Sequence, residues 1–204
     1  MPDIIKILPT EVSNKIAAGE VVQRPSSVLK EILENSIDAN SSKIKIVIKN
    51  AGKNLIQVID DGQGMSRNDM YKSFVKHATS KINKVDDIFS INSMGFRGEA
   101  LAAIASVSMI EMSSSKLNEN DGYFIELNGG KIISEKELIG NKGTSIKVQN
   151  LFYNVPARRN FLKSDFVELK HIINVFNNIA LSHNEIEFSF CLLYTSPSPR
   201  DLST

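Results

Sequence analysis

The strands that this sequence predicts arrive as hairpins, and that feature constrains the fold more than any other. Ile44, Ile46 and Ile48 alternate with Lys43, Lys45 and Val47, and a second β-rich run, 55–59, follows the turn residues 50–54. Alternation with a period of two indicates a strand with one buried face, so the two runs predict a hairpin that ends at Asp60. Further strands are expected over 123–127, 131–133, 144–149 and 186–190, the first two joined by the turn Asn128-Gly129-Gly130.

Helices are predicted where apolar residues recur at helical spacing. The predicted helices span 25–39, 66–77, 100–105 and 164–183. Pro25 can open the first, and Ser66 with Asp69 resembles a capping box at the start of the second. Because the strands come as hairpins rather than alternating with helices, we expect an α+β sandwich. Its helices would lie on one face of a mixed, mostly antiparallel sheet, which is not a doubly wound arrangement.

The composition excludes several classes of function. Lys and Arg number 24 against 23 Asp and Glu, so binding of a polyanion would depend on a local patch. The single cysteine, Cys191, excludes an intramolecular disulfide and a cysteine-rich zinc site, which fits a reducing compartment. No run approaches the roughly 20 apolar residues that cross a bilayer, and residues 1–15 lack the apolar stretch of a signal peptide. We therefore expect a cytoplasmic protein without a membrane partner.

Three polar residues on the first predicted helix could carry chemistry. Glu31, Asn35 and Asp38 are spaced four and then three residues apart, so they share one helix face, opposite most of the apolar stripe. A carboxylate and an amide one turn apart could hold a metal ion and position a water molecule. A solvated helix face would explain the same pattern.

Two glycine-containing segments could form a ligand pocket. Asp60 ends an apolar strand and is followed by Gly62 and Gly64. A buried carboxylate there could accept a hydrogen bond from an exocyclic amine, and the glycines would leave room for a planar base; a tight turn is the alternative. Segment 95–99 precedes a helix, where backbone N–H groups can cradle phosphate, although a structural loop is its ordinary explanation. The sequence has no Walker-type Gly-x-x-x-x-Gly-Lys-Ser/Thr motif, so a nucleotide site would be built differently.

Taken together, these segments resemble the four motifs of the GHKL ATPases, which include gyrase B, the large heat-shock chaperones, sensor histidine kinases and MutL. In order, they are Glu31-x-x-x-Asn35, Asp60-x-Gly62-x-Gly64, the 95–99 loop and Gly143-Thr144. Longer strings resemble the MutL/PMS family of mismatch-repair ATPases over about 4–190. These strings are 16–22 with Arg24-Pro25, 77–81, 95–101 and 151–159. The resemblance implies the GHKL (Bergerat) α/β sandwich.

The resemblance implies ATP and Mg²⁺ as ligands and gives roles to residues of the first helix. In the family, the glutamate that matches Glu31 is the general base, which orients or activates the water that attacks the γ-phosphate. The asparagine that matches Asn35 is the magnesium ligand. Asp38, on the same helix face, would lie beside them in the nucleotide site. Phosphoryl transfer depends mainly on positioning and charge stabilisation, so this face would carry the chemistry.

The resemblance also implies a base pocket and two lids. Asp60 matches the aspartate that pairs with the adenine amino group, and Gly64 and Thr144 would line the base pocket directly or through water. Lid closure over the phosphates would be part of catalysis. The first lid loop would contain Gly95, Phe96, Arg97 and Gly98, and a second mobile segment would contain Thr79 and Lys81.

The family's domain organisation differs from that of this chain. We expect a GHKL ATPase domain over 1–190, whose end merges into a missing second domain of ribosomal-S5-like fold. A non-native or disordered tail is expected over 191–204, where two prolines interrupt any regular structure. In the family, the second domain supplies a lysine that reaches the γ-phosphate, and a C-terminal dimerisation domain carries an endonuclease in many members. The chain would therefore bind ATP weakly and hydrolyse it slowly at best.

The implied function is a slow ATPase switch in DNA mismatch repair, in which lid closure and dimerisation signal to repair partners. Those partners would be a mismatch-recognition protein of MutS type, a downstream nuclease or helicase, weakly bound DNA and a second copy of the full-length protein. A basic cluster, Arg158, Arg159 and Lys163, could touch DNA or simply be solvated. His77 is given no chemical role. The alternatives are a DNA- and protein-binding scaffold with a vestigial nucleotide site, and another GHKL ATPase of topoisomerase or chaperone type.

Overall fold

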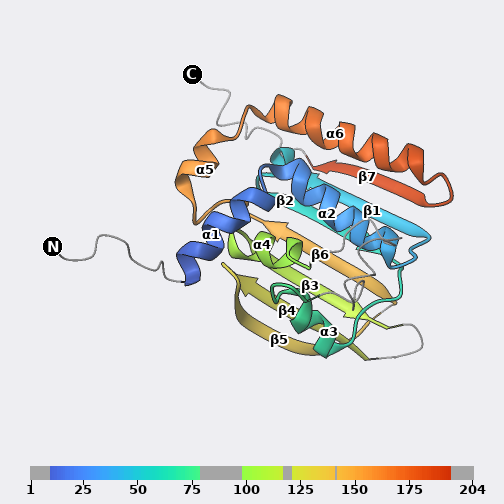
Figure 1. The fold of residues 1–204 in the computed structure, drawn as a ribbon. Coiled ribbons are helices and arrows are strands. Elements are labelled where there is room, and N and C mark those ends of the chain that lie inside the picture. The colour runs from blue at the N-terminus through green and yellow to red at the C-terminus, as the bar shows by residue number, and fades with distance from the viewer. Residues whose placement is uncertain (1–9, 79–97, 117–120, 141, 194–204) are drawn as a thin grey trace, which may run out of the picture.

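A seven-stranded sheet forms the centre of the computed structural model, which describes residues 10–78, 98–116, 121–140 and 142–193 (Figure 1). The strand order is β5-β4-β3-β6-β2-β1-β7. All neighbouring pairs are antiparallel except β1 and β7, which run parallel, so the predicted mixed, mostly antiparallel sheet is confirmed. The strands are β1 (Lys43–Lys49), β2 (Leu55–Asp60), β3 (Met109–Ser115), β4 (Asp121–Asn128), β5 (Lys131–Ile139), β6 (Gly143–Gln149) and β7 (Glu187–Leu193).

Helices lie over one face of this sheet (Figure 1). In this layer α2 packs against β2 and α6, and α1 packs against α4. Among the described residues, no helix is both long enough and apolar enough to span a membrane. The helices are α1 (Thr10–Val21), α2 (Pro25–Asp38), the 3-10 helix η1 (Asn50–Gly52), α3 (Arg67–Ser73), α4 (Ala100–Ser106), α5 (Pro156–Phe161) and α6 (Asp165–Ser182).

Side-chain alternation on β1 places the core under the helices. Ile44, Ile46 and Ile48 are each 1% exposed or less, whereas Lys43 and Lys45 are exposed. Burying one such side chain stabilises the fold by about 1.5–3 kcal/mol. A shift of one residue in register would expose all three isoleucines, so this face of β1 is strongly specified.

β2 extends the same alternation to a charged residue. Ile56, Val58 and Asp60 occupy its buried face, and Asp60 lies directly opposite Ile44 of β1. Successive side chains of a strand point to opposite faces, so the two apolar residues determine where the carboxylate points. The core that stabilises the hairpin therefore also turns a carboxylate inward at the end of β2.

The predicted start of the second helix is confirmed, but its predicted end is wrong. The Ser66 hydroxyl accepts a hydrogen bond from the Asp69 amide at 3.2 Å, as a capping residue does. The helix, α3, ends at Ser73 rather than at His77. The next amides donate to carbonyls three residues earlier instead of four, and His77 has a φ of 62°, which no right-handed helix can contain.

The last strand is longer than the sequence predicts. β7 continues past residue 190 to Leu193, because Cys191 and Leu192 pair with Val47 and Ile48 of β1. Residues 191–193 of the predicted tail are therefore strand residues. Three elements, α1, β3 and α5, were not predicted at all. Of these, β3 matters most because it borders the site described next.

Candidate functional site

The carboxylate of Asp60 is the centre of the candidate site. The residue is only 9% exposed. Its Oδ1 accepts hydrogen bonds from the backbone amides of Gly62 at 3.0 Å and Thr144 at 3.2 Å, and its Oδ2 accepts one from the Ser36 hydroxyl at 2.8 Å. An ionised carboxylate can accept about four hydrogen bonds. The three donors therefore leave room for one more, on Oδ2.

Asp60 and its neighbour Asp61 have opposite environments. Burial raises the pKa of the Asp60 carboxyl, and its hydrogen bonds offset that shift only in part. Burial also acts to raise the pKa of Asp61, but hydrogen bonds from Ser42 and Lys43 outweigh it and lower this pKa. Asp61 Oδ1 accepts from the amides of both residues at 2.7 and 2.8 Å. Asp61 therefore fastens the start of β1, whereas Asp60 keeps an acceptor position open.

Gly62 and Gly64 are required by the packing of the protein itself. Gly64 has a φ of +68°, and a Cβ on it would lie 1.9 Å from the Ser115 carbonyl oxygen. A Cβ on Gly62 would lie 2.7 Å from the Ser41 hydroxyl and 2.8 Å from the Ala39 Cβ. From the sequence alone, both glycines are expected to leave space for a planar base. The structure gives a different reason, which is close approach of the loop after β2 to β3 and to the end of α2.

A pair of hydroxyl groups joins β3 and β6 beside this loop. Thr144 lies directly opposite Asp60 in the β2–β6 pair and is 8% exposed. Its hydroxyl is 2.8 Å from that of Ser114 on β3. The Ser114 oxygen also accepts from the Met65 amide at 2.9 Å and lies 3.0 Å from the Gly143 carbonyl oxygen. The wall of the site is therefore held by bonds that connect three strands and the loop.

Two serines complete this network, and neither was predicted. Ser36 interrupts the apolar stripe of α2 one turn after Ile32 and Leu33, and it is 3% exposed. A hydroxyl at a core position needs a buried partner, so this pattern is a signal that could have found it. Ser114 belongs to an unpredicted strand, and its partners lie 30 and 49 positions away in the chain. No local pattern marks such a residue.

The predicted catalytic face of α2 flanks the Asp60 loop. Glu31, Asn35 and Asp38 are half-buried, so this is not a fully solvated helix face. The Ser36 bond to Asp60 and a bond from the Gln63 amide to the Ala39 carbonyl at 2.9 Å fasten the C-terminal half of α2 to the loop. The part of the chain that the structure describes contains no cluster of three or more His, Cys, Asp or Glu side chains that could hold a metal ion.

Of the predicted lid residues, Gly98 is described. A Cβ on Gly98, whose φ is +61°, would lie 2.4 Å from the Ala78 carbonyl oxygen. The His77 amide donates to the Gly98 carbonyl at 3.1 Å, and the His77 ring lies 3.0 Å from the Glu99 carboxylate. Residues 78 and 98 are therefore side by side next to the start of α4. Outside the described residues lie Thr79, Lys81, Gly95, Phe96 and Arg97.

Arg158 does not belong to an exposed basic patch. Its Nη1 donates to the Val22 carbonyl at 2.9 Å, just past the C-terminal end of α1. A Cβ on Gly19 would overlap its Nη2 at 1.7 Å, so the guanidinium lies directly against α1. Of the predicted basic cluster, Arg159 and Lys163 are exposed. Arg158 has a structural role because it attaches α1 to the start of α5.

Comparison with known proteins assigns the chain to a family. A family model described as "Histidine kinase-, DNA gyrase B-, and HSP90-like ATPase" matches residues 23–154, a span that includes α2, the Asp60 loop and β6. The chain belongs to this family of ATPases. Within it, the chain is similar to proteins named DNA mismatch repair protein MutL. It is 57% identical over 189 residues to that of Christiangramia forsetii and 49% identical over 198 residues to that of Bacteroides fragilis.

These alignments cover 93% and 97% of this chain, but the chain spans only 31% of the length of each relative. Solved structures agree. The Aquifex aeolicus MutL ATPase domain complexed with ADP superposes with a TM-score of 0.67 at 30% identity, over 84% of this chain and 61% of that one. A structure described as the N-terminal domain of a DNA repair protein gives a TM-score of 0.74 at 27% identity, over 88% and 52%. The predicted GHKL fold and the predicted resemblance to MutL are confirmed.

Proposed function

We propose that this chain is the ATP-binding and slowly hydrolysing head of a MutL-type mismatch-repair protein. The observation that carries the proposal is the buried Asp60 carboxylate, which has three protein donors and one remaining acceptor position. A group of this kind, walled by Gly64 and Thr144, would recognise a ligand by hydrogen-bond polarity. The ADP complex of the Aquifex aeolicus relative supports a nucleotide as that ligand.

Asp60 would select adenine over guanine. The free lone pair on Oδ2 would accept a hydrogen bond from the exocyclic amine of adenine, whereas guanine carries a carbonyl oxygen at that position and would bring two acceptors together. A buried acceptor without a donor costs about 1–3 kcal/mol, which corresponds to a preference of roughly tenfold to a hundredfold. Loss of this discrimination is therefore a direct readout of the role of Asp60.

The α2 face would carry the chemistry. Asn35 would hold Mg²⁺ through its amide oxygen, which suits a cation that takes oxygen ligands and keeps several waters and phosphate oxygens. When bound, Mg²⁺ supplies charge neutralisation on the phosphates. Glu31 would hold the attacking water and accept its proton, with Asp38 on the same face of the nucleotide site. The segments that contain Thr79, Lys81 and 95–98 would close over the phosphates.

The wider function is proposed from the similarity to MutL. The ATPase domain would extend to the end of β7 at Leu193, and a second domain of the intact protein would complete the phosphate site. ATP binding would drive dimerisation of the heads, and the closed state would signal to a mismatch-recognition protein of MutS type and to a downstream nuclease or helicase. DNA would bind weakly, and the protein would work in the cytoplasm, on the nucleoid.

Asp60→Asn tests the proposal while preserving shape. The asparagine oxygen can still accept hydrogen bonds from the Gly62 and Thr144 amides, but its NH₂ group would face the ligand where the carboxylate would accept a hydrogen bond. We expect Mg²⁺-dependent binding of a non-hydrolysable ATP analogue to the 204-residue chain to weaken by about a hundredfold or more, measured by calorimetry. Asp61→Asn, next to it, should keep binding. Unchanged analogue affinity in a folded Asp60→Asn chain would refute the assignment.

The same variant separates binding from stability as pH changes. Burial raises the pKa of Asp60, so the folded state holds this proton more tightly than the unfolded state does. Protonated Asp60 therefore stabilises the folded state when the pH is below 3.8, the ordinary pKa of an aspartate carboxyl. This stabilisation is lost as the pH rises through the raised pKa of the folded state. Asp60→Asn should not destabilise the free chain at neutral pH. In the wild type, analogue affinity should fall as acid protonates Asp60.

Glu31→Ala tests the chemical step. The variant should still bind the ATP analogue, because the adenine pocket and Asn35 remain. It should lose ATP hydrolysis, because the general base is removed. The assay follows phosphate release in a version of the protein that contains its second domain. Equal hydrolysis rates in the wild type and the Glu31 variant would contradict the role of Glu31.

A further inference from the structure

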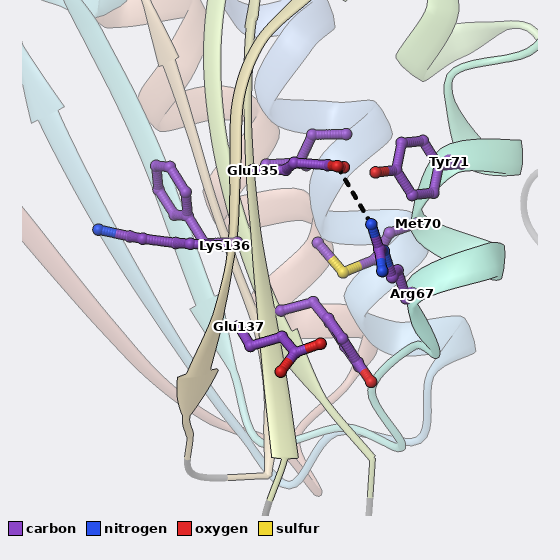
Figure 2. Close-up of a pocket in the computed structure, with 9 residues that line it drawn as sticks. Arg67, Met70, Tyr71, Glu135, Lys136 and Glu137 are labelled. Atoms are coloured by element: carbon purple, nitrogen blue, oxygen red, sulfur yellow. Dashed lines mark hydrogen bonds and ion pairs between the residues drawn. The ribbon is translucent and has the colours of Figure 1, made fainter.

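A cavity of about 220 Å³, separate from the Asp60 site, lies between α3 and the outer strands β4 and β5 (Figure 2). Its lining residues belong to none of the nucleotide-site network. Met70 and Ile125 form an apolar floor, at 2% and 3% exposed. Tyr71 and Tyr123 line it as well and are half-buried. A pocket with an apolar floor and aromatic sides can take a side chain that has a hydrocarbon stem and a polar end.

The protein already places one of its own cations at this cavity. Arg67 Nη2 lies 3.1 Å from Glu135 Oε1, and the guanidinium lies 5.9 Å from the centroid of the Tyr71 ring (Figure 2). A carboxylate beside an aromatic face is an arrangement that attracts guanidinium or ammonium groups. The cavity therefore already accommodates one positively charged group of the protein itself.

Glu137 is a second such carboxylate, for which the described residues supply no cation. It follows Glu135 by two residues on β5, so both carboxylates are on the same face of the strand, and Tyr123 lies directly opposite Glu137 on β4. No described Lys, Arg or His side chain forms an ion pair with Glu137. Lys136 points away from Arg67, to the other side of β5 (Figure 2), and packs over the Phe124 ring at 4.9 Å. Within the described part of the chain, Glu135 therefore has a cationic partner and Glu137 has none.

β5, the strand that carries both carboxylates, is an edge strand of the sheet that the structure describes. β5 pairs with β4 on one side, and the described residues place no strand on its other side. Such an edge presents backbone N–H and C=O groups that an extended peptide can join as an additional strand. Alternate side chains of the added strand would point to the face of Glu135 and Glu137. Edge and cavity are therefore placed to act together.

We propose that β5 and this cavity bind an extended, basic segment of a partner protein. The segment adds to the β5 edge through backbone hydrogen bonds, and one arginine or lysine side chain enters the cavity with Glu137 as its counterion. Its methylene stem contacts the Met70 and Ile125 floor, and its charged end lies beside the tyrosines. Backbone pairing supplies affinity, and the carboxylate supplies the preference for a basic residue.

The test uses the 204-residue chain and the peptide acetyl-Thr-Val-Arg-Val-Thr-amide. Binding is followed by NMR, where the ring signals of Tyr71 and Tyr123, two of only four tyrosines, report on the cavity directly. We expect these signals to shift on titration. Replacing the peptide arginine by citrulline, which is neutral and nearly isosteric, should weaken binding roughly tenfold, as should raising the salt concentration.

Matched variants locate the charge. Glu137→Gln should weaken the arginine peptide roughly tenfold and leave the citrulline peptide unchanged. Glu126→Gln makes the same change on the opposite face of β4 and should leave both peptides unchanged. Because Glu137 is exposed, its variant should fold like the wild type. A peptide with N-methylated valines should also bind more weakly if it adds to the edge.

Three results would overturn the proposal. The first is an absence of tyrosine shifts at millimolar arginine peptide. The second is equal binding of the arginine and citrulline peptides. The third is equal loss in the Glu126 and Glu137 variants, which would show a general charge effect. None of these measurements contains nucleotide, so their outcome is independent of the proposed ATPase function.

Discussion

β1 and β5 start from similar sequences and end in opposite environments. Both begin Lys-Ile and carry further isoleucines, yet Ile44 and Ile46 of β1 are 1% exposed or less while Ile132 and Ile139 of β5 are 49% and 95% exposed. The helices α2 and α6 lie over the β1 half of the sheet, whereas the seven-residue α3 is the helix that reaches β5 (Figure 1). The alternation along a strand indicates which side chains share a face. Whether that face is buried depends on the helix that covers it.

The same division separates the two kinds of site. On the covered half, the Asp60 carboxylate accepts three hydrogen bonds from three different segments, which hold it in one geometry. On the open half, Glu137 has no ion-pair partner among the described residues, and its strand has a free edge. Covered sheet therefore suits a preorganised small-molecule site, and open sheet suits a surface that a partner completes.

The largest expected difference between the halves is in stability. Ile46→Ala should reduce the free energy of unfolding by about 3 kcal/mol, because it removes buried methyl groups and leaves a cavity. Ile139→Ala, the matched change on β5, should stay within about 0.5 kcal/mol of the wild type. Urea titration of the two variants measures both values. Equal losses of unfolding free energy would mean that β5 is covered in solution, which would contradict the difference between the two halves of the sheet.

A smaller difference in stability is expected between alanine substitutions at two glycines, one of which is closely packed while both have positive φ. Gly64 and Gly130 both have positive φ, at +68° and +83°, but a Cβ on Gly64 would lie 1.9 Å from a backbone oxygen and one on Gly130 no nearer than 3.6 Å to any atom. Gly130→Ala should cost about 1 kcal/mol from φ alone. Gly64→Ala should cost at least about 1 kcal/mol more, because a strand carbonyl must move. Similar thermal unfolding of the two variants would contradict this account.

The smallest expected change in stability is that of Gly19→Ala, and its sign depends on whether Arg158 is present. Gly19→Ala puts a methyl group where the Arg158 guanidinium lies, so Arg158 must give up its bond to the Val22 carbonyl. The variant should lose about 1 kcal/mol, since a charge-assisted bond outweighs the better helix propensity of alanine. In an Arg158→Ala background, Gly19→Ala should instead gain about 0.5–1 kcal/mol. A double-mutant cycle by chemical unfolding tests the reversal; the same sign in both backgrounds would exclude the coupling.

Local pattern was sufficient for most of the covered half. Periodicity predicts the apolar stripe of α2, the β1–β2 hairpin and the position of Asp60 at the end of that hairpin. Each of these features depends on residues that are close together in the sequence. Pattern also placed Glu31, Asn35 and Asp38 on one helix face. β3 and α1 were not predicted. β3 lies between β4 and β6 in the sheet, and no local signal states that order.

The amino-acid sequence by itself determined which faces of the strands and helices are apolar, and therefore that a carboxylate would be turned inward at Asp60. Only the tertiary structure decided what that carboxylate meets. Its partners Ser36 and Thr144 lie 24 and 84 positions away, and the glycines that follow it are required by contacts with β3 and α2. Periodicity acts over a few residues, whereas a binding site is assembled by contacts between segments that are distant in the chain. That is why the position of Asp60 could be predicted and its surroundings could not.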